Sequence, residues 1–225
     1  MFPVILIVAI VIHSTYACSS ITQINVTHDS IPLSTRFYWM RVANRALAEH
    51  GSPCPFAAFA TVIVNHTANA RGDEVCVGVN QMSTTGNPSA HGEMVAINNC
   101  TDILTAKDGR YRLSPEEALN AFSQLSLYTN AESCPMCASA VRWAGFKEYI
   151  FGTSIGTLTK AGWDQIQITS HKIFSESDHM QPRTFYLPDV LTNETNPYFM
   201  WQYNPTYPCP SGCRRTQSNG DCEPY

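Results

Sequence analysis

The chain carries little positive charge, and that charge is scattered. Lysine and arginine together number 14 of 225 residues against 18 acidic residues, which leaves a formal net charge of −4. Arg36, Arg41 and Arg45 step around a predicted helix, and Arg214 and Arg215 form an isolated pair. Proteins that bind nucleic acids usually carry a basic patch or stripe. Its absence argues against an RNA or DNA partner and favours a small-molecule substrate.

Long apolar runs are also missing. Residues 4–12 form an unbroken apolar run of nine residues, whereas a helix that spans a bilayer needs about twenty. A short polar stretch follows, and then Ala17, a small residue suited to signal peptidase. We therefore predict a signal peptide over residues 1–17 and a secreted protein with no transmembrane span after its removal. A retained signal anchor is the alternative, because no basic residue precedes the run.

Four Asn-x-Ser/Thr sequons, at Asn25, Asn65, Asn99 and Asn193, agree with export and predict a glycoprotein. Asn65 falls in a predicted hairpin turn and is the best placed of the four. Asn99 falls on a predicted packed helix and is the least well placed.

Cysteine is plentiful, with nine residues in the chain. Two belong to the metal motif described below, and the other seven are Cys18, Cys54, Cys76, Cys100, Cys209, Cys213 and Cys222. In an oxidising compartment we expect disulfides that tie the C-terminal tail to itself, to Cys18 or to Cys54. Because seven is odd, at least one of these thiols is free or pairs with another chain, and the sequence does not specify the connectivity.

Predicted helices and strands alternate along the chain, with no internal repeat and enough apolar residues (44%) for one core. We expect helices over residues 34–50, 90–104 and 158–166, and others that open at Ser114 and Cys134. We expect strands over residues 56–64, 75–80, 125–129 and 148–151. This order predicts an α/β domain over residues 34–204. Residues 18–33 are then an N-terminal extension, and residues 205–225 a Cys- and Pro-rich tail without regular structure.

Two short segments, about forty residues apart, carry the chemistry. Residues 88–93 read Pro-Ser-Ala-His-Gly-Glu, and residues 132–137 read Glu-Ser-Cys-Pro-Met-Cys. One imidazole (His91) and two thiolates (Cys134 and Cys137) suit Zn²⁺, and no fourth Cys or His stands at finger-like spacing. The fourth position is then left to water, whose pKa zinc lowers to about 7, with Glu93 as the natural base. A closed structural zinc site and a disulfide or redox pair are the alternatives.

In these segments the chain resembles the cytidine and deoxycytidylate deaminase superfamily, whose pattern is His-x-Glu followed by Pro-Cys-x-x-Cys. It is similar to the purine-directed branch of guanine deaminases and tRNA adenosine deaminases, through residues 55–64, 78–80, 87–93 and 127–137. The resemblance covers roughly residues 35–205 and implies a three-layer α-β-α cytidine-deaminase-like sandwich with a central mixed sheet. It also implies Zn²⁺ as cofactor, Glu93 as proton shuttle, and a homodimer in which residues 199–203 of one subunit complete the neighbouring site.

The resemblance also supplies the predicted substrate contacts. Asn80 would hydrogen-bond the bound base or its sugar, unless it is only a turn residue. Phe56 and Trp163 would stack on a flat ring, although core packing is the more common role of an aromatic side chain. The remaining candidates are Ala90, Ser133 and Asp164.

Two residues depart from the family pattern: Ser133 stands where proline is usual, and Gln165 stands where guanine deaminases have a second acid after the position of Asp164. We therefore weigh three functions. The first is a secreted zinc-dependent aminohydrolase of purine metabolism that releases ammonia from a purine base or nucleoside, with guanine-like substrates favoured. The second is a deaminase of cytidine or of adenosine in RNA. The third is a secreted zinc-binding protein without turnover.

Overall fold

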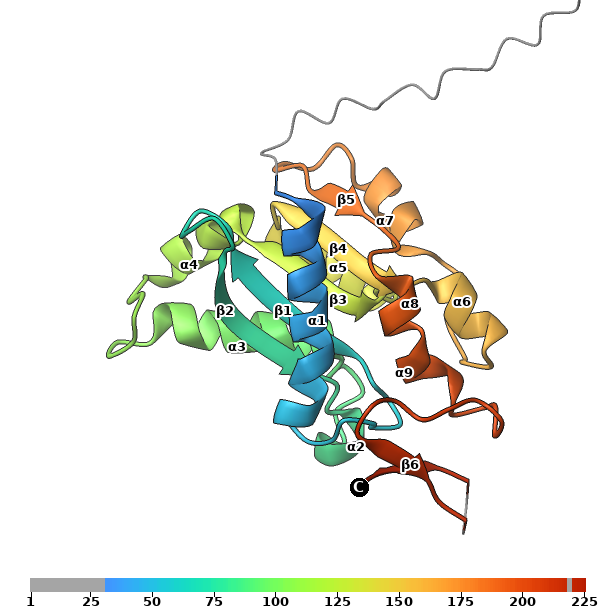
Figure 1. Ribbon diagram of the computed structural model, residues 1–225. Coiled ribbons are helices and arrows are strands. Elements are labelled where there is room, and N and C mark those ends of the chain that lie inside the picture. Colours follow the sequence, from blue (N-terminus) through green and yellow to red (C-terminus); the bar gives the residue numbers. More distant parts are fainter. Residues whose placement is uncertain (1–30, 218–219) are drawn as a thin grey trace, which may run out of the picture. The chain divides into compact units, whose positions relative to one another are not determined.

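The computed structural model describes residues 31–217 and 220–225. The predicted signal peptide, Cys18, Asn25 and most of the N-terminal extension lie outside the described residues. A five-stranded sheet runs in the order β2-β1-β3-β4-β5 (Figure 1). Its strands are β1 (Ala60–Asn65), β2 (Asp73–Val79), β3 (Ser126–Ala131), β4 (Glu148–Thr153) and β5 (Phe185–Leu187). β1 pairs antiparallel with β2 and β3, whereas β4 pairs parallel with β3 and β5, so the expected mixed sheet is confirmed.

Helices cover both faces of this sheet (Figure 1). On one face lies α1 (Leu33–Glu49), with α6 (Ile155–Lys160), α8 (Thr192–Thr195) and α9 (Pro197–Met200) beside it. On the other lie α3 (Gly92–Thr105), α4 (Pro115–Ala121), the 3₁₀ turn η1 (Phe122–Gln124), α5 (Pro135–Ala144) and α7 (Ser170–Glu176). A short α2 (Met82–Thr85) follows β2. The three-layer α-β-α arrangement is therefore as expected.

Side chains of the central strands alternate between two cores, as the two-residue repeat of a strand requires. Val62, Tyr128 and Ile150 pack on the α1 side. Leu127 and Tyr149 pack on the side of α3 and α5. Every residue of β3 and β4 is buried, because helices cover both faces.

One buried ion pair fastens α1 to the sheet. The Arg36 guanidinium donates to the two Glu148 carboxylate oxygens over 2.8 and 3.3 Å, and the Ser126 hydroxyl donates to the same carboxylate over 2.6 Å. Both Arg36 and Glu148 are buried, at 5% and 1% exposure. Each charge is thus compensated chiefly by the other and by local hydrogen bonds, which makes the pair sensitive to the loss of either partner.

Three predicted boundaries are wrong for local reasons. β1 begins at Ala60 instead of residue 56, because a tight turn in which the Phe59 N–H donates to the Ala57 carbonyl precedes it. The helix expected over residues 158–166 is α6, which begins after a Ser154 cap and ends before Gly162, where φ is +105°. Helix α1 begins at Leu33 without a Ser34 cap. In contrast, the helix predicted to open at Ser114 has a full capping box.

The expectation that the tail lacks regular structure is also wrong. β6 (Cys213–Arg215) and β7 (Cys222–Pro224) form a two-stranded antiparallel sheet. The expected bridges from the tail to itself and to Cys54 are present as Cys209–Cys222 and Cys54–Cys213, and they hold this small sheet in place. A third disulfide, Cys76–Cys100, joins β2 to α3. Among the cysteines of the described ranges, only Cys134 and Cys137 are unpaired.

Within residues 31–217 and 220–225, no helix combines the length and the apolar character needed to cross a bilayer.

Candidate metal centre and active site

The three predicted metal ligands lie at the starts of two helices on one side of the sheet. His91 is the N-cap residue of α3, and Cys134 is the N-cap residue of α5. Pro135 occupies the first position of α5, where its fixed φ suits a helix and its missing N–H costs nothing. Gly92 lets α3 begin against the segment before β1, since an added Cβ would lie 2.9 Å from the Phe59 carbonyl oxygen.

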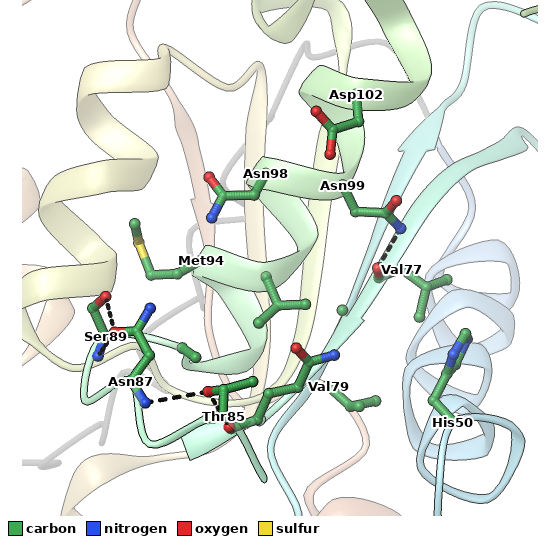
Figure 2. Close-up of a pocket in the computed structure, with 14 residues that line it drawn as sticks. His50, Val77, Val79, Thr85, Asn87, Ser89, Met94, Asn98, Asn99 and Asp102 are labelled. Atoms are coloured by element: carbon green, nitrogen blue, oxygen red, sulfur yellow. Dashed lines mark hydrogen bonds between the residues drawn. The ribbon is translucent and has the colours of Figure 1, made fainter. Parts of the chain in front are cut away.

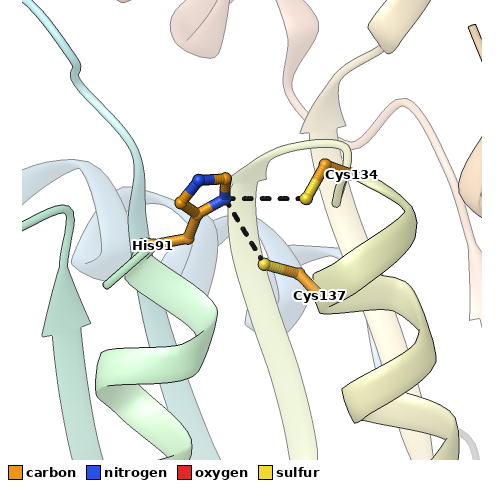
Figure 3. Close-up of side chains that lie close together, drawn as sticks. All are labelled: His91, Cys134 and Cys137. Atoms are coloured by element: carbon orange, nitrogen blue, oxygen red, sulfur yellow. Dashed lines mark hydrogen bonds between the residues drawn. The ribbon is translucent and has the colours of Figure 1, made fainter. Parts of the chain in front are cut away.

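The geometry of these ligands fits tetrahedral zinc (Figure 3). The His91 Nδ1 atom lies 3.6 Å from the Sγ atoms of both Cys134 and Cys137, and the three ligand atoms all lie within 4.8 Å of one another. Zn–N and Zn–S bonds of about 2.0 and 2.3 Å at a tetrahedral angle predict a nitrogen–sulfur separation of about 3.5 Å, close to the separation found. The residues present therefore fit one Zn²⁺ ion and leave one coordination position for a non-protein ligand.

Hydrogen bonding within the site already favours a thiolate. Hydrogen bonds from Cys137 and His91 lower the pKa of the Cys134 thiol to about 4. The hydrogen bond to Cys134, together with burial, raises the pKa of Cys137. The first proton is thus lost from Cys134, and the positive end of the α5 dipole favours that charge. Metal binding would displace the second proton from Cys137.

Glu93 stands apart from the ligand set. It lies in the first turn of α3, is only 5% exposed, and is not among the three groups that converge on the metal position. Burial raises the pKa of its carboxyl, opposed by the Ser133 side chain and by its own backbone N–H. The direction of this change is the one that general acid–base catalysis favours, because a carboxyl works best as a proton shuttle when its pKa lies close to the operating pH.

Ser133, the departure from the family pattern, is accommodated by the fold. It is fully buried, and its N–H, which a proline would lack, donates to the Tyr149 hydroxyl over 2.8 Å. Its own hydroxyl has no hydrogen-bond partner among the described residues, yet lies near enough to the Glu93 carboxylate to lower its pKa. The serine thus adds one polar atom beside the predicted proton shuttle without disturbing the adjacent metal ligand.

The structure adds a residue that the sequence interpretation missed. Glu132 is 6% exposed, and its carboxylate accepts hydrogen bonds from the Ile155 N–H at 2.8 Å and from the N–H and hydroxyl of Ser170 at 2.8 and 2.7 Å. It therefore ties the Cys134 loop to the starts of α6 and α7. The sequence does carry a signal for this role: an acidic residue stands just before the Cys pair, in an apolar segment between a strand and a helix.

Phe56 and Asn80 line one cavity of about 340 Å³. The Asn80 N–H donates to the Phe59 carbonyl at 2.9 Å, and the next residue, Gln81, donates its N–H to the Ala90 carbonyl at 2.9 Å. Three segments, at residues 56–59, 80–81 and 90–92, therefore meet beside His91. The structure thus brings the Asn80 segment against Ala90, the residue before His91, and Asn80 shares its cavity with Phe56. The metal ligands and Glu93 do not line that cavity.

A second cavity, of about 470 Å³, lies along α3 and the edge strand β2 (Figure 2). Ala90 and Ser89 contribute to its wall, but the metal ligands do not. The Asn99 side-chain amide, also in this wall, donates to the Val77 carbonyl at 2.9 Å. That bond occupies the amide that a glycan would use, in agreement with the low ranking of this sequon.

Trp163 and Asp164 are separated by the fold despite being neighbours. Trp163 is 9% exposed, donates its indole N–H to the Phe199 carbonyl at 2.7 Å, and lies 5.6 Å from the Phe56 ring between centroids. Asp164 is exposed and lines neither cavity. The structure therefore joins Trp163 to the Phe56 side of the site, whereas a substrate contact for Asp164 stays a prediction.

Removing one ligand is expected to empty the metal site. In Cys134→Ser, the zinc content measured by plasma mass spectrometry should fall from about one ion per chain to below about 0.1, because only two strong ligands remain. Met136→Leu is the matched control, since Met136 lies between the two cysteines and is 38% exposed. Full zinc content in Cys134→Ser would show that other groups hold the ion.

This site and fold define a class of zinc-binding deaminases. The family model described as the cytidine and deoxycytidylate deaminase zinc-binding region matches residues 33–153, and the chain belongs to this family. Guanine deaminase from Bacillus subtilis (strain 168) is 30% identical over 130 residues, which cover 57% of this chain and 72% of that protein. tRNA-specific adenosine deaminase 2 from Xenopus laevis is 24% identical over 126 residues, which cover 53% and 68%.

The fold agrees with this family. The solved structure of guanine deaminase from Nitrosomonas europaea aligns with a TM-score of 0.51 over 75% of this chain and 82% of that chain, at 16% sequence identity. At this identity the likeness establishes a shared fold. The chain is therefore a member of the deaminase family with a zinc-binding site and a cytidine-deaminase-like α/β fold.

Proposed function

We propose that this protein is a secreted, zinc-dependent aminohydrolase that releases ammonia from a purine base or nucleoside, with guanine-like substrates favoured. The observation that carries the proposal is the three-ligand site of tetrahedral dimensions with the buried Glu93 carboxyl beside it. The 30% identity to a guanine deaminase supports the purine preference. The predicted signal peptide and the three disulfides support export.

The chemistry divides between the metal and this chain's own groups. Bound zinc supplies a Lewis acid that makes water nucleophilic near neutral pH. Glu93 accepts a proton from the attacking water and delivers it to the ring nitrogen beside the amino-bearing carbon. It then accepts a second proton, from the hydroxyl that has added to this carbon, and supplies it to the amine, which leaves as ammonia. Burial raises the pKa of the Glu93 carboxyl, which strengthens it as a proton acceptor.

A small, flat substrate suits the cavity that Phe56 and Asn80 share. At about 340 Å³ it lies at the lower end of the range for small-molecule pockets. Asn80 offers both a donor and an acceptor for a base edge, and the half-exposed Phe56 ring offers a stacking surface. The net charge of −4 argues against binding to the phosphate backbone of a nucleic acid. These features favour a free base or nucleoside over RNA, and the family resemblance favours a homodimer.

A substrate panel tests this proposal. Protein collected from the medium of a secreting host should begin at Cys18 and release ammonia from guanine or guanosine faster than from adenosine or cytidine. A preference for cytidine would favour the pyrimidine alternative, and affinity for RNA that falls steeply with salt would favour the RNA alternative. If fully zinc-loaded protein releases no ammonia from any of these substrates, the result would favour the third alternative, a zinc-binding protein without turnover.

A further inference from the structure

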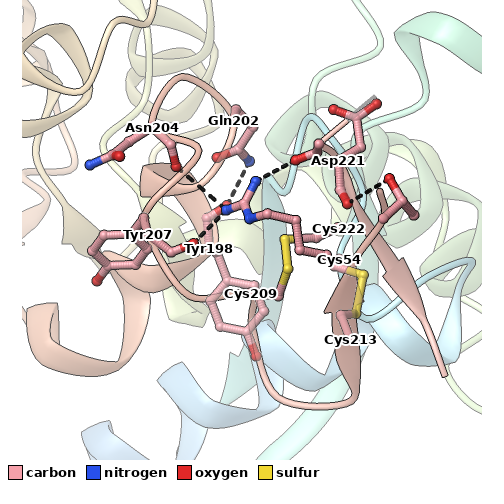
Figure 4. The surroundings of a disulfide bond; sticks show 12 residues. Cys54, Tyr198, Gln202, Asn204, Tyr207, Cys209, Cys213, Asp221 and Cys222 are labelled. Carbon is pink, nitrogen blue, oxygen red and sulfur yellow. Dashed lines mark hydrogen bonds between the residues drawn. A yellow bond between two sulfur atoms is a disulfide. The ribbon is translucent and has the colours of Figure 1, made fainter. Parts of the chain in front are cut away.

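The disulfide-rich tail is fastened to the loop that forms one wall of the proposed substrate cavity. Cys54, two residues before Phe56, is bonded to Cys213 on β6 (Figure 4). Both sulfur-bearing residues are buried, together with Trp201 and Cys222, in a small core of their own. The loop that carries Phe56 is therefore covalently joined to a segment about 160 residues further along the chain.

Gln202 provides a second attachment, independent of the disulfide. Its side-chain amide donates to the Phe56 carbonyl and to the Tyr198 carbonyl, each at 2.8 Å. One NH₂ group thereby links the end of α9 to the backbone of the cavity wall. Neither carbonyl belongs to a strand or receives a ladder hydrogen bond, so the glutamine supplies a partner that the sheet does not.

Aromatic rings from the same segment pack on the Phe56 side chain. The Phe56 ring lies 6.0 Å from Trp201 and 5.9 Å from Tyr203 between centroids, both in edge-on geometry. The Phe56 side chain is nevertheless 50% exposed and borders the cavity shared with Asn80. The tail thus supports one side of this ring while leaving another side open to a ligand.

We propose that residues 198–215 form a strap that holds the Phe56 wall in its binding position, with Gln202 and the Cys54–Cys213 bond as its two fasteners. The proposal rests on the proposed function and identifies Gln202 as a positioning residue for the stacking of a flat heteroaromatic ring. A loop that is already ordered before binding does not lose conformational entropy when the ligand arrives. Loosening the strap should therefore weaken substrate binding and leave the proton transfers at Glu93 unchanged.

Two fastener variants and two matched controls test the strap. Gln202→Met keeps the side-chain length but removes the donor, and Cys54→Ser/Cys213→Ser removes the covalent link. Gln124→Met changes an exposed glutamine elsewhere, and Cys76→Ser/Cys100→Ser removes a disulfide that lies outside the strap and joins β2 to α3. The readouts are KM, kcat, zinc content, thermal midpoint, and hydrogen exchange of residues 52–59 in the metal-loaded protein.

Each fastener variant should raise KM by about tenfold, keep kcat within about twofold, and speed hydrogen exchange of residues 52–59 by at least about tenfold. Both controls should stay within about twofold of wild type. Gln202→Met keeps all of the disulfides. If hydrogen exchange of residues 52–59 is unchanged in this variant, the proposed strap is wrong. Faster exchange with unchanged KM would show that the strap does not serve the substrate. Because exchange is measured without turnover, it separates failure of the strap from failure of the proposed deamination.

Discussion

Glu93→Gln is expected to lower kcat by at least about 10³-fold while the protein keeps its zinc. Positioned acid–base groups contribute about 10²–10⁴-fold, and here one carboxyl is asked to move both protons of the reaction. Glutamine has the same shape but cannot accept or release a proton at neutral pH. Since Glu93 is not among the three converging ligands, the metal site should remain intact. Ammonia release and zinc content, measured on the same preparation, check both statements.

Glu116→Gln is the matched control, because it removes an exposed carboxylate on α4. It should behave as wild type. A zinc-loaded Glu93→Gln protein that keeps more than about a tenth of wild-type turnover would contradict the role of Glu93. If wild type and variant both bind zinc and neither turns over any nucleobase, the protein is a zinc-binding member of the family without catalysis.

The metal ligands could be predicted because the information is local. His91 and Cys134 each cap a helix whose start is encoded within a few residues, so the pattern itself specifies the geometry. Their supporting residues could not be predicted in this way. The Ser133 N–H meets Tyr149 from the next strand, and the Phe56 carbonyl meets Gln202 from a segment 146 residues away. Such partners come from distant parts of the chain and depend on the whole fold, and no short motif contains that information.

The order of helices and strands could likewise be predicted from periodicity, whereas some ends could not. The strand that ends at Asn65 starts late because of one tight turn, in which the Phe59 N–H donates to the Ala57 carbonyl, and apolar composition does not encode such a turn. In the tail, the Cys209–Cys222 disulfide ties β7 to the segment before β6, and the Cys54–Cys213 disulfide ties β6 to the rest of the domain. Composition predicts a cysteine-rich segment here, but it does not specify which cysteines pair, and the pairing is what orders the segment.

Arg36→Met is expected to destabilise the fold by about 3–5 kcal/mol, the usual cost of leaving a buried charge without its partner. Glu148 is 1% exposed, and among the residues that the structure describes its carboxylate would keep the Ser126 hydroxyl alone as a hydrogen-bond donor. Denaturant unfolding at pH 7 measures the loss. Arg41→Met is the matched control, since its pair with Glu194 lies at the surface with the arginine side chain 48% exposed, and such pairs contribute about 0–1 kcal/mol.

The pH dependence and a double variant separate lost charge from lost packing. In wild type, burial acts to raise the pKa of Glu148, but the hydrogen bonds and charge of Arg36 together with Ser126 lower it below its ordinary value. Its contribution to stability is therefore present above the unfolded pKa of about 4.3 and is lost as the pH falls below it. Without Arg36, burial is the largest remaining influence on the pKa of Glu148 and raises it, so the folded variant binds a proton at Glu148 more readily than wild type does. The penalty of Arg36→Met should therefore shrink steadily as the pH falls from 7 toward 4.

Arg36→Met/Glu148→Gln should recover most of the lost stability at pH 7, because the neutral amide keeps an acceptor for Ser126 and no unpaired charge is buried. If the double variant is as unstable as Arg36→Met, the loss comes from the packing of the Arg36 stem between α1 and the sheet. A penalty that stays constant from pH 7 to 4 would point to the same conclusion. Only the combination of recovery and pH dependence assigns the free energy to the charge of Glu148.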